Sequence, residues 1–273
     1  MIFCGDMSIP NAECGKVLRD SMEKLGIFKG ETTIINLEGV IKDPIPKNSF
    51  WKVYNDKSAT EIKSTTGRLI YSLGNNHTYD FPESIKPTLS LLEDNGIGYC
   101  GLLVDDVAKP YEFKSNGYEY AIFGHCWEIY TRTNVNLSSP DRVLSCHYQD
   151  FYDIVSMYVN YHPEVRVICF MHWNFDMEKL PFPSLKKLAR DLVDIGVWTV
   201  IGNHAHCMQE WEIYKGKMIA YGLGNFYMPD GYFFNGQLKF PRESHKSYAV
   251  EIDESTGECK IHYLDNPMGG VLY

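Results

Sequence analysis

Short apolar runs alternate along the chain with longer segments in which apolar residues recur every three or four positions. The short runs are rich in β-branched and aromatic residues, which is typical of buried strands. The predicted strands cover residues 1–6, 32–39, 68–77, 118–127, 165–173, 197–204 and 217–226, and a terminal hairpin covers 247–264.

The longer segments predict helices at residues 11–28, 58–67, 84–97, 147–161 and 184–196. The last of these places its apolar residues on one helical face, namely Leu185, Leu188, Ala189, Leu192 and Val193. Pro87 is compatible with a helix only in the first turn. Pro44 and Pro46 predict an irregular segment over residues 42–57.

Strands that alternate with helices favour a layered α/β architecture. We find no repeat and no linker, and therefore expect one domain over residues 1–273. No apolar run approaches the roughly 20 residues that span a membrane. The first residues, MIFCGDMSIP, lack the basic region and long apolar stretch of a signal peptide. We therefore expect a cytoplasmic protein with no membrane span.

Composition narrows the choice of partners. The chain is 44% hydrophobic and 22% charged, as in a folded globular protein, and its net charge of −9 disfavours binding to a nucleic-acid backbone. The negative net charge does not exclude an anionic substrate, because a bound metal ion can reverse the local electrostatic field. The eight cysteines show no CxxC spacing, so we expect reduced thiols that pack as small hydrophobic residues.

Five predicted strands are followed by a carboxylate, amide or imidazole at their carboxyl ends. In layered α/β folds these ends lie along one edge, where ligands bind. A mixture of His, Asp, Glu and Asn suits Mn, Fe, Zn or a similar divalent metal, and the set is larger than one tetrahedral ion requires. We therefore expect one or two ions near Asp6, Glu38, Asn76, His77, His172, His204 and His206.

Each of these residues also has a simpler explanation when taken alone. Asp6 suits a helix cap, Asn76 a turn, and Glu38 a solvated position after a strand. Their shared position at strand ends favours metal ligation. For the other histidines we prefer structural, hydrogen-bonded roles, namely for His125, His147, His162, His245 and His262.

Two further groups of residues keep two interpretations. The first group consists of aromatic residues that either fill the core, which we prefer, or form a stacking wall for a ligand: Trp51, Tyr54, Trp127, Tyr130 and Trp173. The second group consists of basic residues that either belong to a solvated loop or add positive charge near an anionic substrate: Lys239, Arg242 and Lys246.

The ordered motifs GD, NLE, NNH, HW and HxH, followed by YGLGNF, run from about Gly5 to Phe226. This order resembles the CapA-type family of poly-γ-glutamate capsule biosynthesis proteins, which is similar to calcineurin-like metallophosphoesterases. The resemblance implies a four-layer α-β-β-α sandwich with mixed sheets.

The resemblance also implies roles for individual residues. Asp6 and His206 would hold a first metal ion, Glu38 would bridge two ions, and a second ion would be held by Asn76, His172 and His204. His77 would be a general acid or would stabilise the transition state. Contacts to the substrate or to the ligands themselves would come from Asn75, Trp173, Asp176 and Asn225.

The chain departs from the pattern of the resemblance at several positions. Ser8 stands where phosphoesterases carry the histidine of an Asp-x-His motif, which removes one imidazole from the first metal. The usual His-Trp-Gly-x-Glu is His-Trp-Asn174-Phe-Asp176, with a shorter acid at its end. Ala205 replaces the usual proline between the paired histidines.

Our leading hypothesis is a metal-dependent hydrolase that uses Mn, Fe, Zn or Mg ions. Its substrate would be an anionic or polymeric molecule with a phosphoester or related ester or amide linkage, within capsule or poly-γ-glutamate metabolism. The alternative is a non-catalytic accessory subunit that binds an anionic polymer or a synthase partner. A nucleotide-dependent ligase is disfavoured, because the sequence has no GxxxxGK[ST] loop.

Overall fold

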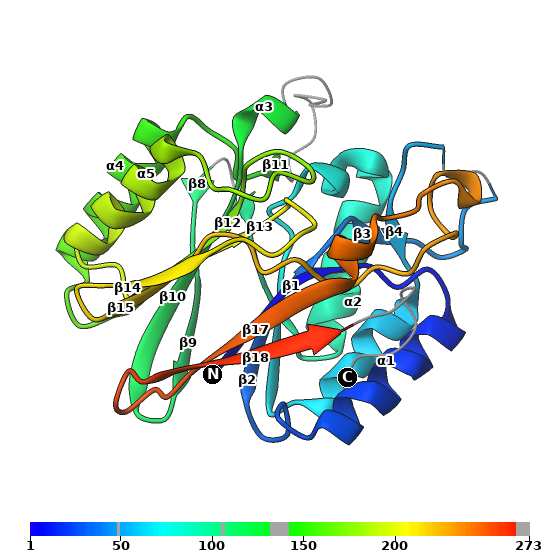
Figure 1. The fold of residues 1–273 in the computed structure, drawn as a ribbon, viewed down its shortest axis with the longest axis horizontal. Helices are drawn as coiled ribbons and strands as arrows, with labels where there is room; N and C mark the ends of the chain where they lie inside the picture. Colours follow the sequence, from blue (N-terminus) through cyan, green and yellow to red (C-terminus); the bar gives the residue numbers. More distant parts are fainter. Residues whose placement is uncertain (48–49, 105–106, 132–141, 266–273) are drawn as a thin grey trace.

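Two β-sheets pack face to face, and helices cover both outer faces (Figure 1). The computed structural model describes residues 1–47, 50–104, 107–131 and 142–265. The first sheet has the order β18-β17-β1-β2-β5-β6, and one further strand, β16, pairs with β1. Its strands are β1 (Ile2–Met7), β2 (Thr32–Leu37), β5 (Arg68–Ser72), β6 (Gly98–Cys100), β16 (Asn225–Tyr227), β17 (Lys246–Ile252) and β18 (Cys259–Asp265).

The second sheet has the order β14-β15-β13-β12-β10-β9. Its strands are β9 (Tyr111–Ser115), β10 (Tyr118–Cys126), β12 (Arg166–His172), β13 (Thr199–Asn203), β14 (Trp211–Tyr214) and β15 (Lys217–Ala220). Both sheets contain parallel and antiparallel pairs, as predicted for mixed sheets. Short strands outside these sheets are β3 (Val40–Ile41), β4 (Tyr54–Asn55), β7 (Leu102–Val104), β8 (Val107–Ala108) and β11 (Arg142–Val143).

The helices form the two outer layers. Helices α1 (Ala12–Leu25) and α2 (Ile85–Asp94) pack on the first sheet, and α4 (Tyr148–Tyr161) and α5 (Pro183–Asp194) pack on the second. A short helix, α3 (Glu128–Thr131), follows β10. The apolar stripe predicted for the segment that forms α5 is buried against its sheet, because burial of that face drives the helix onto the core.

Three hydrophobic clusters separate the four layers. One lies between the first sheet and its helices and a second lies between the second sheet and its helices. The third fills the space between the two sheets and includes Phe3, Ile34 and Phe170. The predicted four-layer α-β-β-α sandwich is therefore confirmed.

The structure differs from the sequence-based prediction in several elements. The segment predicted as a short helix at 58–67 is a 3-10 helix, η1 (Lys57–Thr65), that packs against α1. The run 217–226 divides into β15 and β16, which belong to different sheets. The chain crosses between them through Gly224 at φ +80°, a conformation that glycine adopts at low cost. The prediction missed the edge strands β9 and β14, which are only partly buried and carry a weak apolar signal.

Within the described part of the chain, no helix combines the length and the apolar character needed to span a lipid bilayer. All eight cysteines are free thiols, and six of them are buried. Four of the buried thiols lie in strands of the two sheets: Cys4, Cys100, Cys126 and Cys169. They pack as the small hydrophobic residues that the sequence predicts.

The buried ring of His125 in β10 makes the stability of the fold depend on pH. Its Nε2 lies 3.0 Å from the carbonyl oxygen of Cys146, and burial lowers its pKa from 6.5 to about 4. Between these values the unfolded chain binds a proton that the folded protein does not. The free energy of unfolding should therefore fall as the pH drops from 6.5 to 4, by at most about 1.4 kcal/mol per pH unit from this group.

We expect His125→Gln to reduce this slope, measured by urea unfolding at several pH values between 7 and 4.5. Other groups contribute equally to both proteins, so the difference between the two slopes isolates His125. Equal slopes in the two proteins would show that His125 does not carry this dependence.

Candidate metal centre

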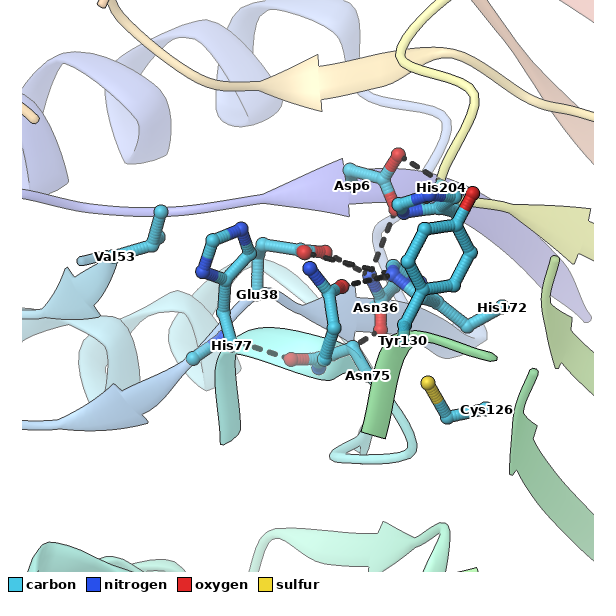
Figure 2. A network of polar contacts seen from close by, with 12 residues as sticks. Asp6, Asn36, Glu38, Val53, Asn75, His77, Cys126, Tyr130, His172 and His204 are labelled. Carbon is cyan, nitrogen blue, oxygen red and sulfur yellow. Dashed lines mark hydrogen bonds and ion pairs between the residues drawn. The ribbon is translucent and has the colours of Figure 1, made fainter. Parts of the chain in front are cut away.

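The carboxyl ends of strands from both sheets meet at one place. Asp6 lies in β1, Glu38 follows β2, and His172 ends β12. All three side chains are buried, and each offers a ligand atom within 4.8 Å of the others. Figure 2 shows them around the amide of Asn36. Asp6 does not cap the following helix, because the side chain of Asn11 caps α1.

Asn36 holds the two buried carboxylates together. Its Nδ2 donates to Asp6 Oδ1 at 2.7 Å and to Glu38 Oε2 at 2.6 Å (Figure 2). It can do so because Asn36 pairs with Asp6 in the parallel register of β1 and β2. Both amide hydrogens are thereby used. Asn36 belongs to the NLE motif, but the motif alone does not indicate a role for this residue.

Asn75 supports this amide from the next strand end. Its Nδ2 donates to the carbonyl of Leu37 at 2.8 Å and to Asn36 Oδ1 at 3.3 Å, and its Oδ1 accepts from the backbone N–H of Gly39 at 3.1 Å. Asn75 is fully buried, so it braces the ends of β2 and β5 from behind the carboxylates. We therefore propose a supporting role for Asn75 rather than contact with a substrate.

Imidazoles from the second sheet face these carboxylates. His172 Nε2 lies 2.7 Å from Asn76 Oδ1 and 3.6 Å from Glu38 Oε1. The ring centroids of His172 and His204 are 4.5 Å apart, and the ring of Tyr130 lies 4.2 Å from that of His204. Tyr130 is half-buried and packs against the core, as preferred from the sequence, and its ring also borders the site.

A second group of candidate ligands joins His204, His206 and Asp176. Asp176 Oδ1 lies 3.7 Å from His204 Nε2 and 3.8 Å from His206 Nε2. His206 Nδ1 lies 2.8 Å from Asn225 Oδ1 and 3.4 Å from Asp6 Oδ2, which links this group to the first. Asn225 reaches this position because it pairs with Asp6 in the register of β1 and β16.

The paired histidines adopt unusual backbone conformations. His204 has φ +89° and His206 has φ +51°, both in the left-handed region that costs energy for residues other than glycine. The backbone N–H of His204 donates to Asp6 Oδ2 at 3.1 Å, which helps to hold this turn. The backbone strain is therefore located where the imidazole rings of His204 and His206 enter the site.

Several buried polar atoms in the centre have no hydrogen-bond partner among the described residues. They include Glu38 Oε1 and both ring nitrogens of His204. A buried polar atom without a partner is costly, and an imidazole nitrogen and a carboxylate oxygen are metal ligands. The residues therefore fit divalent metal ions, in one or both of the two groups.

Burial sets the charge state of the centre. Burial raises the pKa of Asp6, and it raises the pKa of Glu38 well above its ordinary value, with the nearby carboxylate of Asp6 acting in the same direction. Burial and neighbouring imidazoles lower the pKa of His172 and of His204 well below 6.5. No lysine or arginine of the described chain forms an ion pair with either acid. A divalent cation binds well to neutral imidazoles beside buried carboxylic acids, and its binding releases the protons of those acids.

His77 lies beside the centre and is held by an acid that the sequence analysis missed. Its Nδ1 is 2.7 Å from Asp80 Oδ2, which also accepts from the backbone N–H of Val53 at 2.7 Å. A cavity of about 260 Å³ opens next to His77, Asn76, His206 and Asp176, and Lys239 also lines it. The spacing of three residues between His77 and Asp80 on the turn η2 (Asn76–Asp80) was the available sequence signal.

Not every residue named from the sequence reaches the centre. Trp173 is fully buried among apolar residues, and its Nε1 donates to the carbonyl of Tyr221 at 2.8 Å, so we do not propose it as a substrate contact. Ser8 turns away and donates to the carbonyl of Tyr54 at 2.8 Å. Asn174 takes the place of a glycine and has φ +72°, a conformation that asparagine tolerates better than most residues.

The histidines given structural roles lie outside the two groups of candidate ligands. His147 caps α4 by accepting from the N–H of Gln149, and His162 stacks on Tyr158 with ring centroids 4.4 Å apart. The remaining two pair with acids, His245 with Asp230 and His262 with Glu251.

Comparison with known proteins places the chain in a family. A family model described as "Bacterial capsule synthesis protein PGA_cap" matches residues 18–230, and the chain belongs to this family. It is 24% identical over 181 residues to the PGA biosynthesis protein CapA of Bacillus subtilis (strain 168). That match covers 65% of this chain and 47% of the relative, so the chain spans about half the length of this relative.

Two solved structures share the fold. A hypothetical protein from Thermus thermophilus superposes with a TM-score of 0.56 at 15% identity, covering 97% of this chain and 98% of the other. A putative 5'-nucleotidase from Staphylococcus aureus superposes with a TM-score of 0.51 at 11% identity, covering 99% of this chain and 54% of the other. The predicted membership of the capsule family is confirmed, and the layered fold is one that the putative 5'-nucleotidase shares.

The position of Asp176 leads to a test of the second ligand group. We expect Asp176→Asn to weaken the binding of one manganese ion by about tenfold or more, because the variant loses a charged ligand. Equilibrium dialysis with elemental analysis measures this. Glu243→Gln, which removes an exposed carboxylate paired with Lys179, is the matched control. Unchanged manganese affinity in Asp176→Asn would exclude Asp176 as a ligand.

Proposed function

We propose that the protein is a metal-dependent hydrolase that acts on a phosphoester or a related ester or amide linkage. The observation that carries this proposal is the convergence of buried, partly unsatisfied carboxylates and imidazoles beside the His77–Asp80 pair and a cavity. Membership of the capsule synthesis family supports a substrate from capsule or poly-γ-glutamate metabolism.

We propose that the candidate ligands would hold two divalent ions. Glu38 would serve both ions, Asp6 and His206 would hold the first, and Asn76, His172 and His204 would hold the second. Asp176 would take the place of the imidazole absent at Ser8. Divalent ions in such a site would activate water and polarise the bond that it attacks. Asn36 fixes Asp6 and Glu38, so these acids need not reorganise when ions bind.

His77 is the proposed general acid. Asp80 accepts from Nδ1 and so orients the ring, which leaves Nε2 as the atom that would pass a proton to the leaving group. Asp80 is itself held by the backbone N–H of Val53. Asn225 holds the other side of the centre, because its Oδ1 faces Nδ1 of His206 and fixes that ring.

One observation favours a second candidate function. Ser8 faces away from the centre, so the imidazole expected at this position is absent. A centre with one weak ion suits an accessory subunit that binds an anionic polymer or a synthase partner. Full metal occupancy without hydrolysis of phosphomonoesters, phosphodiesters or γ-glutamyl peptides would support this role and contradict the hydrolase.

The proton-donor role of His77 can be tested through the leaving group. We expect His77→Gln to lower kcat for phenyl phosphate by about 100-fold while manganese content stays unchanged. The loss should be smaller for p-nitrophenyl phosphate, because its weakly basic leaving group needs less protonation. Asp80→Asn should lower kcat less than His77→Gln does and shift its pH profile.

The matched control is His262→Gln, which changes a half-buried histidine of β18 paired with Glu251 and should keep full activity. Equal losses for the two substrates would argue that His77 does not donate the proton. Loss of manganese in His77→Gln would instead make His77 a ligand.

A further inference from the structure

We propose that the cavity beside His77 binds a planar ring carried by the substrate, so that the hydrolysed compound is an ester of a ring-bearing alcohol or phenol. This inference rests on the proposed function and adds a substrate class to it. The polar part of the cavity lining includes His77, His206, Asp176 and Lys239. The apolar part, called the wall below, is formed by Val53, Met228, Phe234, Leu238, Phe240 and Pro241. The two parts adjoin, because the ring centroid of Phe240 lies 5.1 Å from that of His206.

The size of the cavity suits one ring. Its volume is about 260 Å³, slightly below the range of about 300–1,000 Å³ that is typical of small-molecule sites. An apolar cavity of about 150 Å³ is enough for benzene. A ring joined to a phosphoryl group could therefore place the ring on the wall and the scissile bond at the polar part.

Ring packing and hydrogen bonds hold the segment that forms most of the wall in a fixed conformation. Phe233 is fully buried and packs its ring 5.5 Å from that of Tyr54, which anchors the segment after β16. The N–H of Gly231 donates to the carbonyl of Leu238 at 2.9 Å, and the N–H of Phe240 donates to Asp230 Oδ1 at 2.9 Å. These bonds close the segment into a compact loop over the cavity, so the wall is formed before a ligand arrives.

Phe234, which lines the cavity, and Trp51, which packs against Phe234, both adopt strained conformations. Trp51 has φ +56° and Phe234 has φ +54°, in a region that is rare for bulky side chains. Their ring centroids lie 5.2 Å apart, and Trp51 remains 64% exposed. Phe234 also lies 6.4 Å from His77, between centroids. Strain of this kind persists at ligand sites because the surrounding structure enforces it. An exposed indole beside a strained phenyl ring offers a stacking surface.

The wall lies mostly outside the part of the chain that the family model matches. That match ends at residue 230, whereas four wall residues follow it: Phe234, Leu238, Phe240 and Pro241.

Binding of two phosphonates to the manganese-loaded protein tests the inference. We expect phenylphosphonate to bind at least about tenfold more tightly than methylphosphonate in calorimetry, because only the former places a ring on the wall. Neither compound is hydrolysed, so the measurement does not depend on activity.

Phe234→Gly should abolish most of this preference and leave the affinity for methylphosphonate unchanged. Glycine adopts a φ near +54° without steric cost, so this variant should fold, which thermal unfolding checks. Tyr263→Ala removes an exposed aromatic ring from β18 and is the matched control.

The outcomes separate the two proposals. Equal binding of both phosphonates to the natural protein would overturn the ring site and leave the hydrolase standing. A preference that survives in Phe234→Gly would also overturn it. Failure of both compounds to bind would contradict the phosphoester function together with the ring site.

Discussion

Two fully buried carboxylates without a basic partner are the constraint on which the centre depends. Asp6 and Glu38 share one amide group, that of Asn36, which satisfies one oxygen of each. A buried charge without compensation costs several kcal/mol. The described chain supplies imidazoles near these acids but no lysine or arginine paired with them, so their charge needs protons or metal cations. The surrounding strand ends bring further candidate ligands close to these two acids.

The backbone around the centre also carries strain. His204, His206, Asn174 and Met177 all have positive φ, as do Phe234, which lines the cavity, and Trp51, which packs against Phe234. The backbone of β1 also lies close to a neighbouring segment, because a side chain at Gly5 would collide with the carbonyl of Gly224. The tightly packed layers hold these conformations in place. Several strained residues therefore lie at the edge of the sandwich where the candidate ligands meet.

The centre combines a family framework with features of its own. The family match includes the acid, amide and imidazole positions from Glu38 to His206. Ser8 departs from the phosphoesterase pattern, and Asp176 Oδ1 lies 3.7 Å from His204 Nε2 and 3.8 Å from His206 Nε2. The aromatic loop after β16 lines the cavity beside His77. The proposed hydrolysis and the proposed ring preference would thus depend largely on different segments of the chain.

Several features could be predicted from the sequence because they depend on local pattern. Alternating apolar runs indicated the layers, and polar residues at strand ends indicated Asp6, Glu38, His172 and His204, since parallel strands bring their carboxyl ends to one edge. The 3-10 geometry of η1 and the division of the run 217–226 were not visible, because tertiary packing and the crossing between sheets decide them.

Only the tertiary structure decided which residues near the motifs contribute to the candidate metal centre. Asn36 became the central donor because the register of β1 and β2 sets it beside Asp6. Asp80 reached His77 through a turn, whereas Trp173, adjacent to His172, faced the opposite side of its strand and entered the core. The sequence by itself determined the layered fold and the residue types of the candidate metal centre. The distances between those residues, their hydrogen-bond partners and the apolar wall of the cavity depend on contacts between segments far apart in the chain. No local sequence pattern encodes such contacts.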